Sequence, residues 1–248
     1  MNPTTPFPSL SFSLSLLLAI GLTTSSLPTL AGDLQDQLDA RRDAFLEKAS
    51  PEIIQSQEKA LAELEASGLT DQARKVGDKA PDFTLGNPDG NQVRLSDLLK
   101  EGPVVLTWYR GGWCPYCNIA LASLTKHNDD FKELGATLVA LTPELPDTTA
   151  ETVKEQGLPF EVLSDIDHQV AEQYGLVFKL NDDTRARYAE KFKLVERSGE
   201  KAADRLPLPA TYVIGTDGVI RYAFLDADYR RRAEPEDIIA ALKKLQGE

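Results

Sequence analysis

Residues 104–117 lead from an apolar strand into a pair of cysteines, and their sequence is VVLTWYRGGWCPYC. The run from Val104 to Tyr109 is what we expect of a strand buried in the middle of a sheet. Pro115 suits the first turn of a helix, so the segment predicts a junction between a strand and a helix. Cys114 and Cys117 are thereby placed at the carboxyl edge of the sheet, where open α/β folds bind ligands.

The sequence around this junction alternates between strand-like and helix-like segments. Further strands are expected at 83–85, 92–95, 137–141, 160–163, 211–214 and 219–224. Helices are expected at 96–99, 115–134, 150–156, 169–174, 184–193 and 235–245. Alternation implies crossover connections and parallel strands, whereas the turn Gly215–Gly218 makes the last two strands an antiparallel hairpin. The predicted fold is therefore α/β, with a central mixed sheet flanked by helices.

Residues 32–75 predict a helical arm in front of a domain that occupies 76–248. The apolar residues fall near one helical face, and charged residues cover the rest. These apolar residues are Leu34, Leu38, Phe45 and Leu46. Pro51 begins a second predicted helix, which continues to about Ala66 before the sequence Ser67-Gly68. Because the segment has few aromatic residues and many charges, we expect it to cover the main domain and not to form a catalytic unit of its own.

The first 31 residues contain no Asp, Glu, Lys or Arg. The apolar run from Leu10 to Leu22 has about the length of a signal-peptide core and is short for a membrane span. The small residues of Thr29-Leu30-Ala31-Gly32 suit cleavage after Ala31. We predict a signal peptide at 1–31 and an exported mature protein (in the periplasm, a lumen or the medium) without a membrane segment. The alternative is a cytoplasmic protein with an N-terminal extension.

The 248-residue chain is acidic, with 27 Lys and Arg against 39 Asp and Glu and a formal charge of −12. Nucleic acids and anionic membranes bind basic surfaces, so neither is expected as a partner. Two cysteines exclude a scaffold of several disulfides. A zinc site would need Cys114, Cys117, His127 and His168 together. We expect no metal and no organic cofactor.

Cys114 is expected to be the more reactive thiol. It precedes the helix, where unpaired N–H groups and the positive end of the helix dipole favour a thiolate. Cys117 lies one turn further on, within reach of a disulfide with Cys114. Because so small a loop adds little stability, the spacing favours redox chemistry. An inert disulfide, two buried thiols and the zinc site are the alternatives.

The chain from about Val76 to Leu245 resembles the peroxiredoxin-like branch of the alkyl hydroperoxide reductase and thiol-specific antioxidant (AhpC/TSA) family, within the thioredoxin-fold superfamily. The resemblance rests on these segments in order: Ala80–Leu85, the Cys-Pro-Tyr-Cys segment, Leu163–Asp165, Leu208–Ile214 and Asp217-Gly218. It implies a thioredoxin-like fold, and it implies that Pro209 is a cis proline facing the redox cysteines.

This resemblance implies a thiol-dependent peroxidase that reduces hydrogen peroxide or organic hydroperoxides. Cys114 would attack the peroxide and become a sulfenic acid, which Cys117 would capture as a disulfide. A thioredoxin-type dithiol would then reduce the disulfide. Two alternatives stay open: an exported thiol–disulfide oxidoreductase acting on protein disulfides, and a non-enzymatic module with a structural disulfide or zinc. The sequence does not predict an oligomeric state.

The residues before Cys114 depart from the family pattern. Peroxiredoxins typically carry Pro-x-x-x-Thr-x-x-Cys up to the attacking cysteine, and here the two marked places hold Thr107 and Gly111. The hydroxyl that would hold the peroxide is therefore missing. Arg110 either compensates, by stabilising the thiolate and donating to a peroxide oxygen, or faces solvent.

Other polar and aromatic residues near the pair have weaker signals. Trp113 and Tyr116 flank the cysteines and are expected to form an exposed apolar rim for the substrate. Asp165 and His168 are interpreted as a loop cap and a solvated helix start, in preference to acid–base residues. The basic run Tyr229–Arg232 is interpreted as a solvated face.

Overall fold

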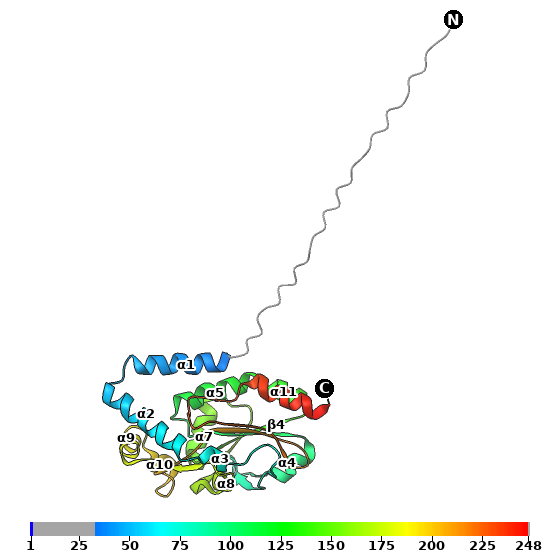
Figure 1. Ribbon diagram of the computed structural model, residues 1–248. Helices are drawn as coiled ribbons and strands as arrows, with labels where there is room; N and C mark the ends of the chain where they lie inside the picture. The colour runs from blue at the N-terminus through cyan, green and yellow to red at the C-terminus, as the bar shows by residue number, and fades with distance from the viewer. Residues whose placement is uncertain (2–32, 248) are drawn as a thin grey trace. The chain divides into compact units, whose positions relative to one another are not determined.

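The computed structural model describes Met1 and residues 33–247, so the predicted signal peptide and its cleavage site lie outside the described residues (Figure 1). The helices are α1 (Asp33–Leu46), α2 (Pro51–Ala66), α3 (Leu69–Gln72), α4 (Leu95–Glu101), α5 (Pro115–Lys126), α6 (Asn128–Glu133), α7 (Pro146–Gln156), α8 (Gln169–Gln173), α9 (Asp182–Phe192), α10 (Leu194–Ser198) and α11 (Pro235–Gln246). The strands are β1 (Thr84–Gly86), β2 (Gln92–Arg94), β3 (Val104–Trp108), β4 (Thr137–Thr142), β5 (Glu161–Ser164), β6 (Val177–Lys179), β7 (Arg205–Pro207), β8 (Ala210–Ile214) and β9 (Ile220–Leu225). Within 33–247, no helix combines the length and apolar character needed to cross a bilayer.

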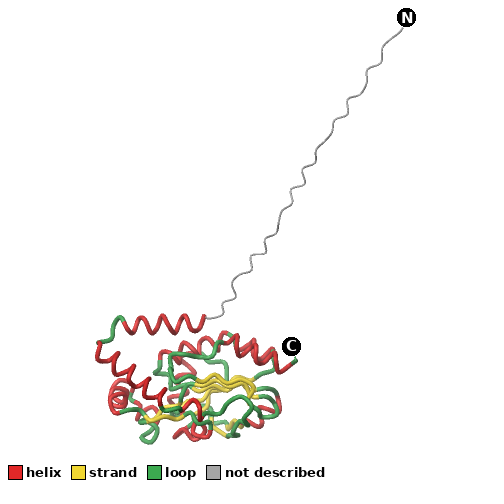
Figure 2. Tube along the Cα trace, viewed as in Figure 1, coloured by secondary structure: helices red, strands yellow, loops and turns green. Residues whose placement is uncertain are grey.

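A five-stranded sheet in the order β5-β4-β3-β8-β9 forms the centre of the domain (Figure 2). Strands β3, β4 and β5 run parallel, whereas β8 is antiparallel to β3 and β9 to β8. The predicted mixed α/β sheet is confirmed, with β3 as its middle strand. Two short antiparallel pairs, β1-β2 and β6-β7, lie outside this sheet.

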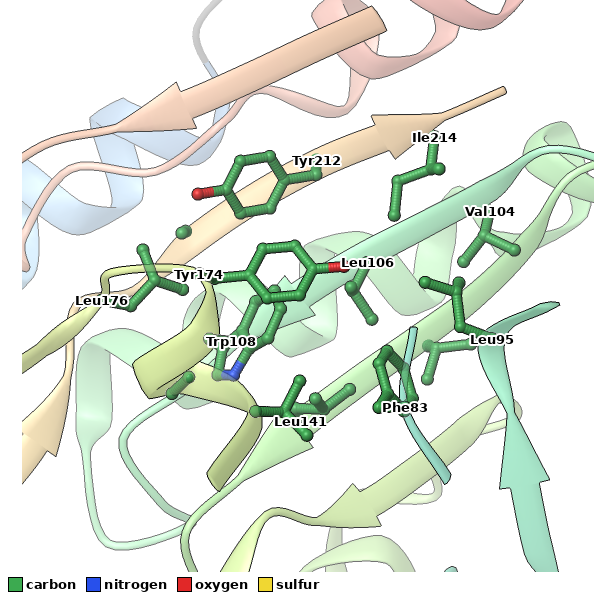
Figure 3. Packing of buried hydrophobic residues seen from close by; sticks show 14 of the residues in the cluster. Phe83, Leu95, Val104, Leu106, Trp108, Leu141, Tyr174, Leu176, Tyr212 and Ile214 are labelled. Carbon is green, nitrogen blue, oxygen red and sulfur yellow. The ribbon is translucent and has the colours of Figure 1, made fainter. Parts of the chain in front are cut away.

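Alternate residues of β3 point to opposite faces of the sheet. Leu106 and Trp108 enter a core in which Trp108 packs on Tyr174, with ring centroids 4.7 Å apart, and on Tyr212 (Figure 3). Val105 faces the other side, where Leu124 of α5 and Leu242 of α11 cover the sheet. The strand therefore ends between two layers that are both closed to water.

The N-terminal region is helical, as predicted. Helix α1 lies along α5 (Figure 1), and its Leu34 and Leu38 are 1% and 0% exposed, in the same cluster as both cysteines. Leu46, at the end of the helix, is exposed, so the predicted apolar face is buried only in its first part.

Helix α2 buries no residue completely and contacts α9. Leu64 of α2 packs against the main core, and the helix is also held by hydrogen bonds. They join Ser56 to Arg187 at 3.2 Å and Glu63 to Asn181 at 2.9 Å.

Two local predictions are wrong. The helix expected at 115–134 is interrupted at His127, where the change of direction accompanies the entry of Phe131, 0% exposed, into the core. The peptide bond before Pro209 is not cis, and neither is any other bond within 33–247. Pro209 lies between β7 and β8, where the Leu208 N–H donates to the Leu176 carbonyl at 2.7 Å. The trans isomer is the one that X–Pro bonds favour in the absence of a special constraint.

Candidate redox site

Two glycines shape the loop between β3 and α5. Gly111 has φ +141°, a conformation that side-chain-bearing residues rarely adopt. At Gly112, an added Cβ would lie 2.2 Å from Oγ1 of Thr152. The loop then enters α5 with Cys114 at the N-cap and Pro115 in the first turn, as the sequence predicted. Cys117 follows within that first turn.

The buried carboxylate of Glu144 holds this loop in place. Glu144 is 0% exposed, and its Oε2 accepts a hydrogen bond from the Gly112 N–H at 2.8 Å. Its Oε1 accepts a hydrogen bond from Nε of Arg197 at 2.6 Å. Burial raises the pKa of Glu144, although the Gly112 N–H and the charge of Arg197 favour the ionised form. The sequence offered no sign of this residue, because its partners lie 32 and 53 positions away.

Both cysteines are free thiols and almost completely enclosed. Cys114 is 2% exposed and Cys117 is 0% exposed. The apolar cluster around them combines residues of the arm, the loop and α5: Leu34, Leu38, Tyr109, Tyr116, Ala120 and Leu121. Large partners cannot touch either sulfur in this conformation.

Arg110 is buried beside the cysteines, so its solvent-facing interpretation is wrong. The residue is 2% exposed, and its Nη1 lies 4.0 Å from Sγ of Cys114. Its guanidinium carbon lies 4.2, 5.0 and 5.3 Å from the ring centroids of Tyr229, Trp113 and Tyr188. Aromatic faces stabilise a cation electrostatically. Among the described residues Arg110 forms no salt bridge, and its Nε has no hydrogen-bond partner.

A second buried arginine contacts the other cysteine. Nη2 of Arg232 lies 3.4 Å from Sγ of Cys117, and Arg232 is 7% exposed. The interpretation of the basic run at 229–232 as a solvated face is therefore wrong at this position. Tyr229 also turns inward, onto Arg110 and onto the ring of Tyr116 at 5.6 Å. A run of three arginines does not reveal which one enters the core, so sequence reasoning missed Arg232.

The surroundings of the two thiols shift their pKa values in opposite directions. Burial raises the pKa of Cys117, but a hydrogen bond from Cys114, the charges of Arg232 and Arg110 and the Arg110 N–H outweigh it and lower this pKa to about 5. Burial raises the pKa of Cys114 well above its ordinary value, and its hydrogen bond to Cys117 and the charge there raise it further. The arrangement thus favours a Cys117 thiolate that accepts a hydrogen bond from the Cys114 thiol. This is the reverse of the thiolate predicted at Cys114.

The remaining predicted residues lie close to the pair but are packed. Tyr116 is 6% exposed, and Trp113 stacks on Phe192 of α9 with centroids 4.6 Å apart, so the two do not form the exposed rim that was expected. Asp165 caps α8 by accepting hydrogen bonds from the N–H groups of Val170 and Ala171, both at 2.8 Å. His168 is buried near the carbonyl of Ala202 and is not solvated.

The structure does not bring together the four residues of the zinc alternative. His127 pairs with Asp130 at 2.8 Å, and His168 faces the carbonyl of Ala202 at 3.4 Å. Throughout the part of the chain that is described, no group of three or more His, Cys, Asp or Glu side chains is arranged to hold a metal ion.

Comparison with known proteins gives a consistent picture. The model of the AhpC/TSA family matches residues 76–223. The chain is 35% identical over 98 residues to peroxiredoxin Bcp of Escherichia coli, which is 40% of this chain and 62% of that protein. It is 36% identical over 94 residues to a putative peroxiredoxin of Mycobacterium tuberculosis, covering 38% and 59%. The matches thus span less than two thirds of these curated relatives.

Solved structures show the same fold. Peroxidoxin BcpB of Mycobacterium tuberculosis superimposes with a TM-score of 0.54 at 24% identity, over 68% of this chain and 97% of that one. The yeast mitochondrial 1-Cys peroxiredoxin gives a TM-score of 0.54 at 17% identity, over 70% and 76%. The thioredoxin-like fold expected from the sequence is confirmed.

Proposed function

The chain belongs to the AhpC/TSA family, and on that basis we propose that it is a thiol peroxidase in which Cys117 attacks the peroxide and Cys114 resolves the product. The observation that carries the assignment of roles is the 3.4 Å contact between Arg232 and the sulfur of Cys117, in a site closed to water. A guanidinium at this distance favours the thiolate, which is the nucleophilic form of cysteine.

The proposed reaction needs only the two sulfurs, a peroxide and a dithiol. The Cys117 thiolate forms a bond to the outer oxygen of ROOH as the O–O bond breaks, and RO⁻ takes up a proton and leaves as the alcohol. Cys114, as a thiolate, then attacks the sulfur of the Cys117 sulfenic acid, and water leaves after one further proton is taken up. A thioredoxin-type dithiol reduces the resulting disulfide by exchange and becomes oxidised itself.

Counting the family pattern from Cys117 supports this order. In Pro-x-x-x-Thr-x-x-Cys, the threonine position then holds Cys114 and the proline position holds Arg110. A thiol thus stands where the family has a hydroxyl, and it donates to the attacking sulfur. The S–H group is a weaker donor than a hydroxyl, and Arg110 adds a charged donor beside it.

The burial of the cysteines favours a peroxidase over a reductase of protein disulfides. Hydrogen peroxide is about the size of two water molecules, whereas a disulfide on a folded protein must reach the sulfur along an open surface. With exposures of 2% and 0%, the two thiols offer no such surface. Reduction by a thioredoxin-type partner therefore requires local opening around α5 after oxidation.

Single substitutions of the cysteines test the proposal. Cys117→Ser should abolish oxidation by hydrogen peroxide, measured by stopped-flow tryptophan fluorescence. Cys114→Ser should still be oxidised once, with a sulfenic acid at Cys117 that dimedone labels and mass spectrometry locates.

The outcome that would contradict the order of attack is a Cys117→Ser protein that still reacts once with peroxide. Reduction of insulin at a rate well above that of free dithiothreitol, together with peroxide oxidation no faster than that of a small thiol, would support the disulfide oxidoreductase instead.

The compartment is a separate part of the proposal. The apolar run at 10–22 and the Thr-Leu-Ala-Gly boundary support export after cleavage behind Ala31. Intact-mass analysis of the protein from its native source tests this, and a soluble cytoplasmic form that retains residues 1–31 would exclude it.

A further inference from the structure

The loop at 226–234, between β9 and α11, reaches the redox pair on one side and the helical arm on the other. We call it the arginine loop, after its three successive arginines at 230–232. Toward the pair it contributes Arg232, which contacts the sulfur of Cys117, and Tyr229, whose ring faces Arg110. One short segment thus contacts both of the buried cations beside the thiols.

Tyr229 contacts the two buried arginines with different atoms. Its ring centroid lies 4.2 Å from the guanidinium carbon of Arg110, and an aromatic face stabilises a cation. Its carbonyl oxygen accepts a hydrogen bond from Nη1 of Arg232, whose Nη2 lies 3.4 Å from the sulfur of Cys117. The position of Tyr229 therefore bears on where both guanidinium groups lie.

Helix α2 of the arm holds the arginine loop from outside. Gln57 donates a hydrogen bond to the hydroxyl of Tyr229, and Glu58 pairs with Nη1 of Arg230 at 2.8 Å. The Glu58 side chain is 53% exposed, and exposed ion pairs contribute little free energy. Gln57 is therefore the attachment with the more direct effect on Tyr229.

The contact between α2 and the arginine loop is not implied by membership of the family. The family model matches residues 76–223, whereas α2 ends at Ala66 and Tyr229 lies beyond the match. Neither Tyr229 nor Gln57 forms a hydrogen bond to a sulfur in the described part of the chain. Any effect of these two residues on the thiols must pass through the arginines.

We propose that Tyr229 is a positioning residue for the redox pair and that α2 fixes its place through Gln57. The ring keeps Arg110 beside Cys114, and the carbonyl keeps Arg232 beside Cys117. The arm thereby acts on the reactivity of the pair without contributing a reactive group. The proposal rests on the thiolate assigned to Cys117 under the proposed function, and it extends the site from the pair to the arm.

Ionisation of the thiol reports this positioning, because a nearby cation favours the charged form of a sulfur. The ionisable side chains near the two sulfurs are Tyr109, Arg110, Tyr116, Glu144, Tyr229 and Arg232. Helix α1 adds Arg41, which lies 5.9 Å from the ring centroid of Tyr116. Burial raises the pKa values of the three tyrosines, so they stay neutral in acid. The carboxyl of Glu144 does not contribute to the ultraviolet absorbance of a thiolate.

Substitutions at Tyr229 test the role of its ring. The ultraviolet absorbance of the thiolate is titrated across the acid and neutral range in the reduced protein, with Cys117→Ser as the blank. Tyr229→Leu removes the aromatic face but keeps an apolar side chain, and it should raise the midpoint by about one pH unit, a tenfold change in the ionisation constant. Tyr229→Phe keeps the ring and should shift the midpoint by less than half as much. Tyr222→Leu is the matched control, because Tyr222 is also half-buried but packs in a cluster that contains neither cysteine.

Substitutions on α2 test how Tyr229 is held. Gln57→Ala removes the donor to the Tyr229 hydroxyl and should shift the midpoint as much as Tyr229→Phe does. The two changes combined should shift it no further, because both remove the same hydrogen bond. Gln55→Ala changes an exposed residue of the same helix and should leave the titration unchanged. Because Gln57 lies outside the core of the domain, this series stays informative if Tyr229→Leu does not fold.

Several outcomes would overturn the inference. An unchanged midpoint in Tyr229→Leu, or an equal shift in Tyr229→Phe, would remove the role of the ring. Additive shifts in the combined variant, or equal shifts in Gln57→Ala and Gln55→Ala, would remove the role of α2.

The titration uses no peroxide, so its result is separate from the test of the proposed function. A parent protein that ionises in acid, but reacts with hydrogen peroxide no faster than a small thiol, would refute the peroxidase and leave the positioning role of Tyr229 intact. A parent protein without a thiolate at Cys117 at neutral pH would overturn both the positioning role and the order of attack.

Discussion

The two faces of the central sheet are equally dry but chemically different. On one face, Trp108, Tyr174 and Tyr212 form an aromatic core (Figure 3). On the other, the neighbouring residue Tyr109 packs with two cysteines, and Arg110 and Arg232 are buried beside them. The last residue of β3 and the residue that follows it therefore lead into two different cores, one that stabilises the fold and one that positions reactive groups.

Burial alone therefore does not identify a reactive site. What distinguishes the second face is buried positive charge: the guanidinium of Arg110 has no carboxylate partner among the described residues, and Arg232 contacts a sulfur. Burying charge without full compensation costs stability. We expect substitutions on the first face to act mainly on folding and those on the second mainly on reactivity.

Trp108→Ala should have the largest effect on stability. Trp108 is 1% exposed and contacts two aromatic rings, so its removal leaves a large cavity. Truncation of a buried Trp typically costs about 3–5 kcal/mol. Urea unfolding followed by circular dichroism measures the loss. A decrease below about 1 kcal/mol would show that this core is not the main source of stability.

Gly112→Ala should have an intermediate effect, about 1–3 kcal/mol as for other overpacked sites. The new methyl group would collide with Thr152 Oγ1, and the loop that carries Cys114 would shift. Combining it with Thr152→Ala should restore part of both stability and peroxide reactivity, because the clashing hydroxyl is removed. If the double variant is no better than Gly112→Ala, the hydrogen bond from Gly112 to Glu144 is the feature that fails.

Arg232→Met should have the smallest effect of the three when expressed as a free energy. It should act on the rate of oxidation, and the size of the effect should depend on pH. Removing the cation disfavours the thiolate, so the pKa of Cys117 rises from about 5. A rise to about 7 would lower the thiolate fraction at pH 6 from about 0.9 to about 0.1, which is roughly tenfold or 1.4 kcal/mol. The oxidation rate should therefore fall at pH 6 and recover above pH 8.

Arg231→Met is the matched control for that experiment, because the Arg231 side chain is 61% exposed and pairs with Asp226 at 3.3 Å. Its pH profile should follow that of the parent protein. An unchanged profile in Arg232→Met would remove the argument that places the thiolate at Cys117.

Much of the fold could be predicted because it depends on local patterns. Several short sequence signals locate the ends of observed elements to within a few residues. They are the apolar run at 104–109, the prolines at 51, 115 and 235, and the turn at 215–218. Strands β6 and β7 were missed because each has three residues and its partner lies far away in the chain, whereas the equally short β1 and β2 are joined by one turn. Pairing between distant short segments leaves no periodic signal.

The candidate site was predictable only in part, for the same reason. Cys114, Cys117, Pro115 and Arg110 are adjacent in sequence, so their junction between strand and helix could be expected. Arg232 comes from a loop 115 positions beyond Cys117, and Glu144 reaches Gly112 from 32 positions away. The helix dipole argument favoured Cys114, but the side chains that the fold brings from elsewhere favour Cys117.

The chain contains no cysteines other than the two enclosed ones. A bulky alkylating reagent can therefore react with the protein only when the structure around α5 or α1 opens. At low reagent concentration the reaction rate reports the equilibrium population of the open state, as amide hydrogen exchange does for single N–H groups. Leu38 is 0% exposed and packs against the pair, so Leu38→Ala should raise the rate of alkylation. The measurement needs no engineered cysteine or attached dye. The redox pair is thus also an intrinsic probe of how firmly the arm is attached to the domain.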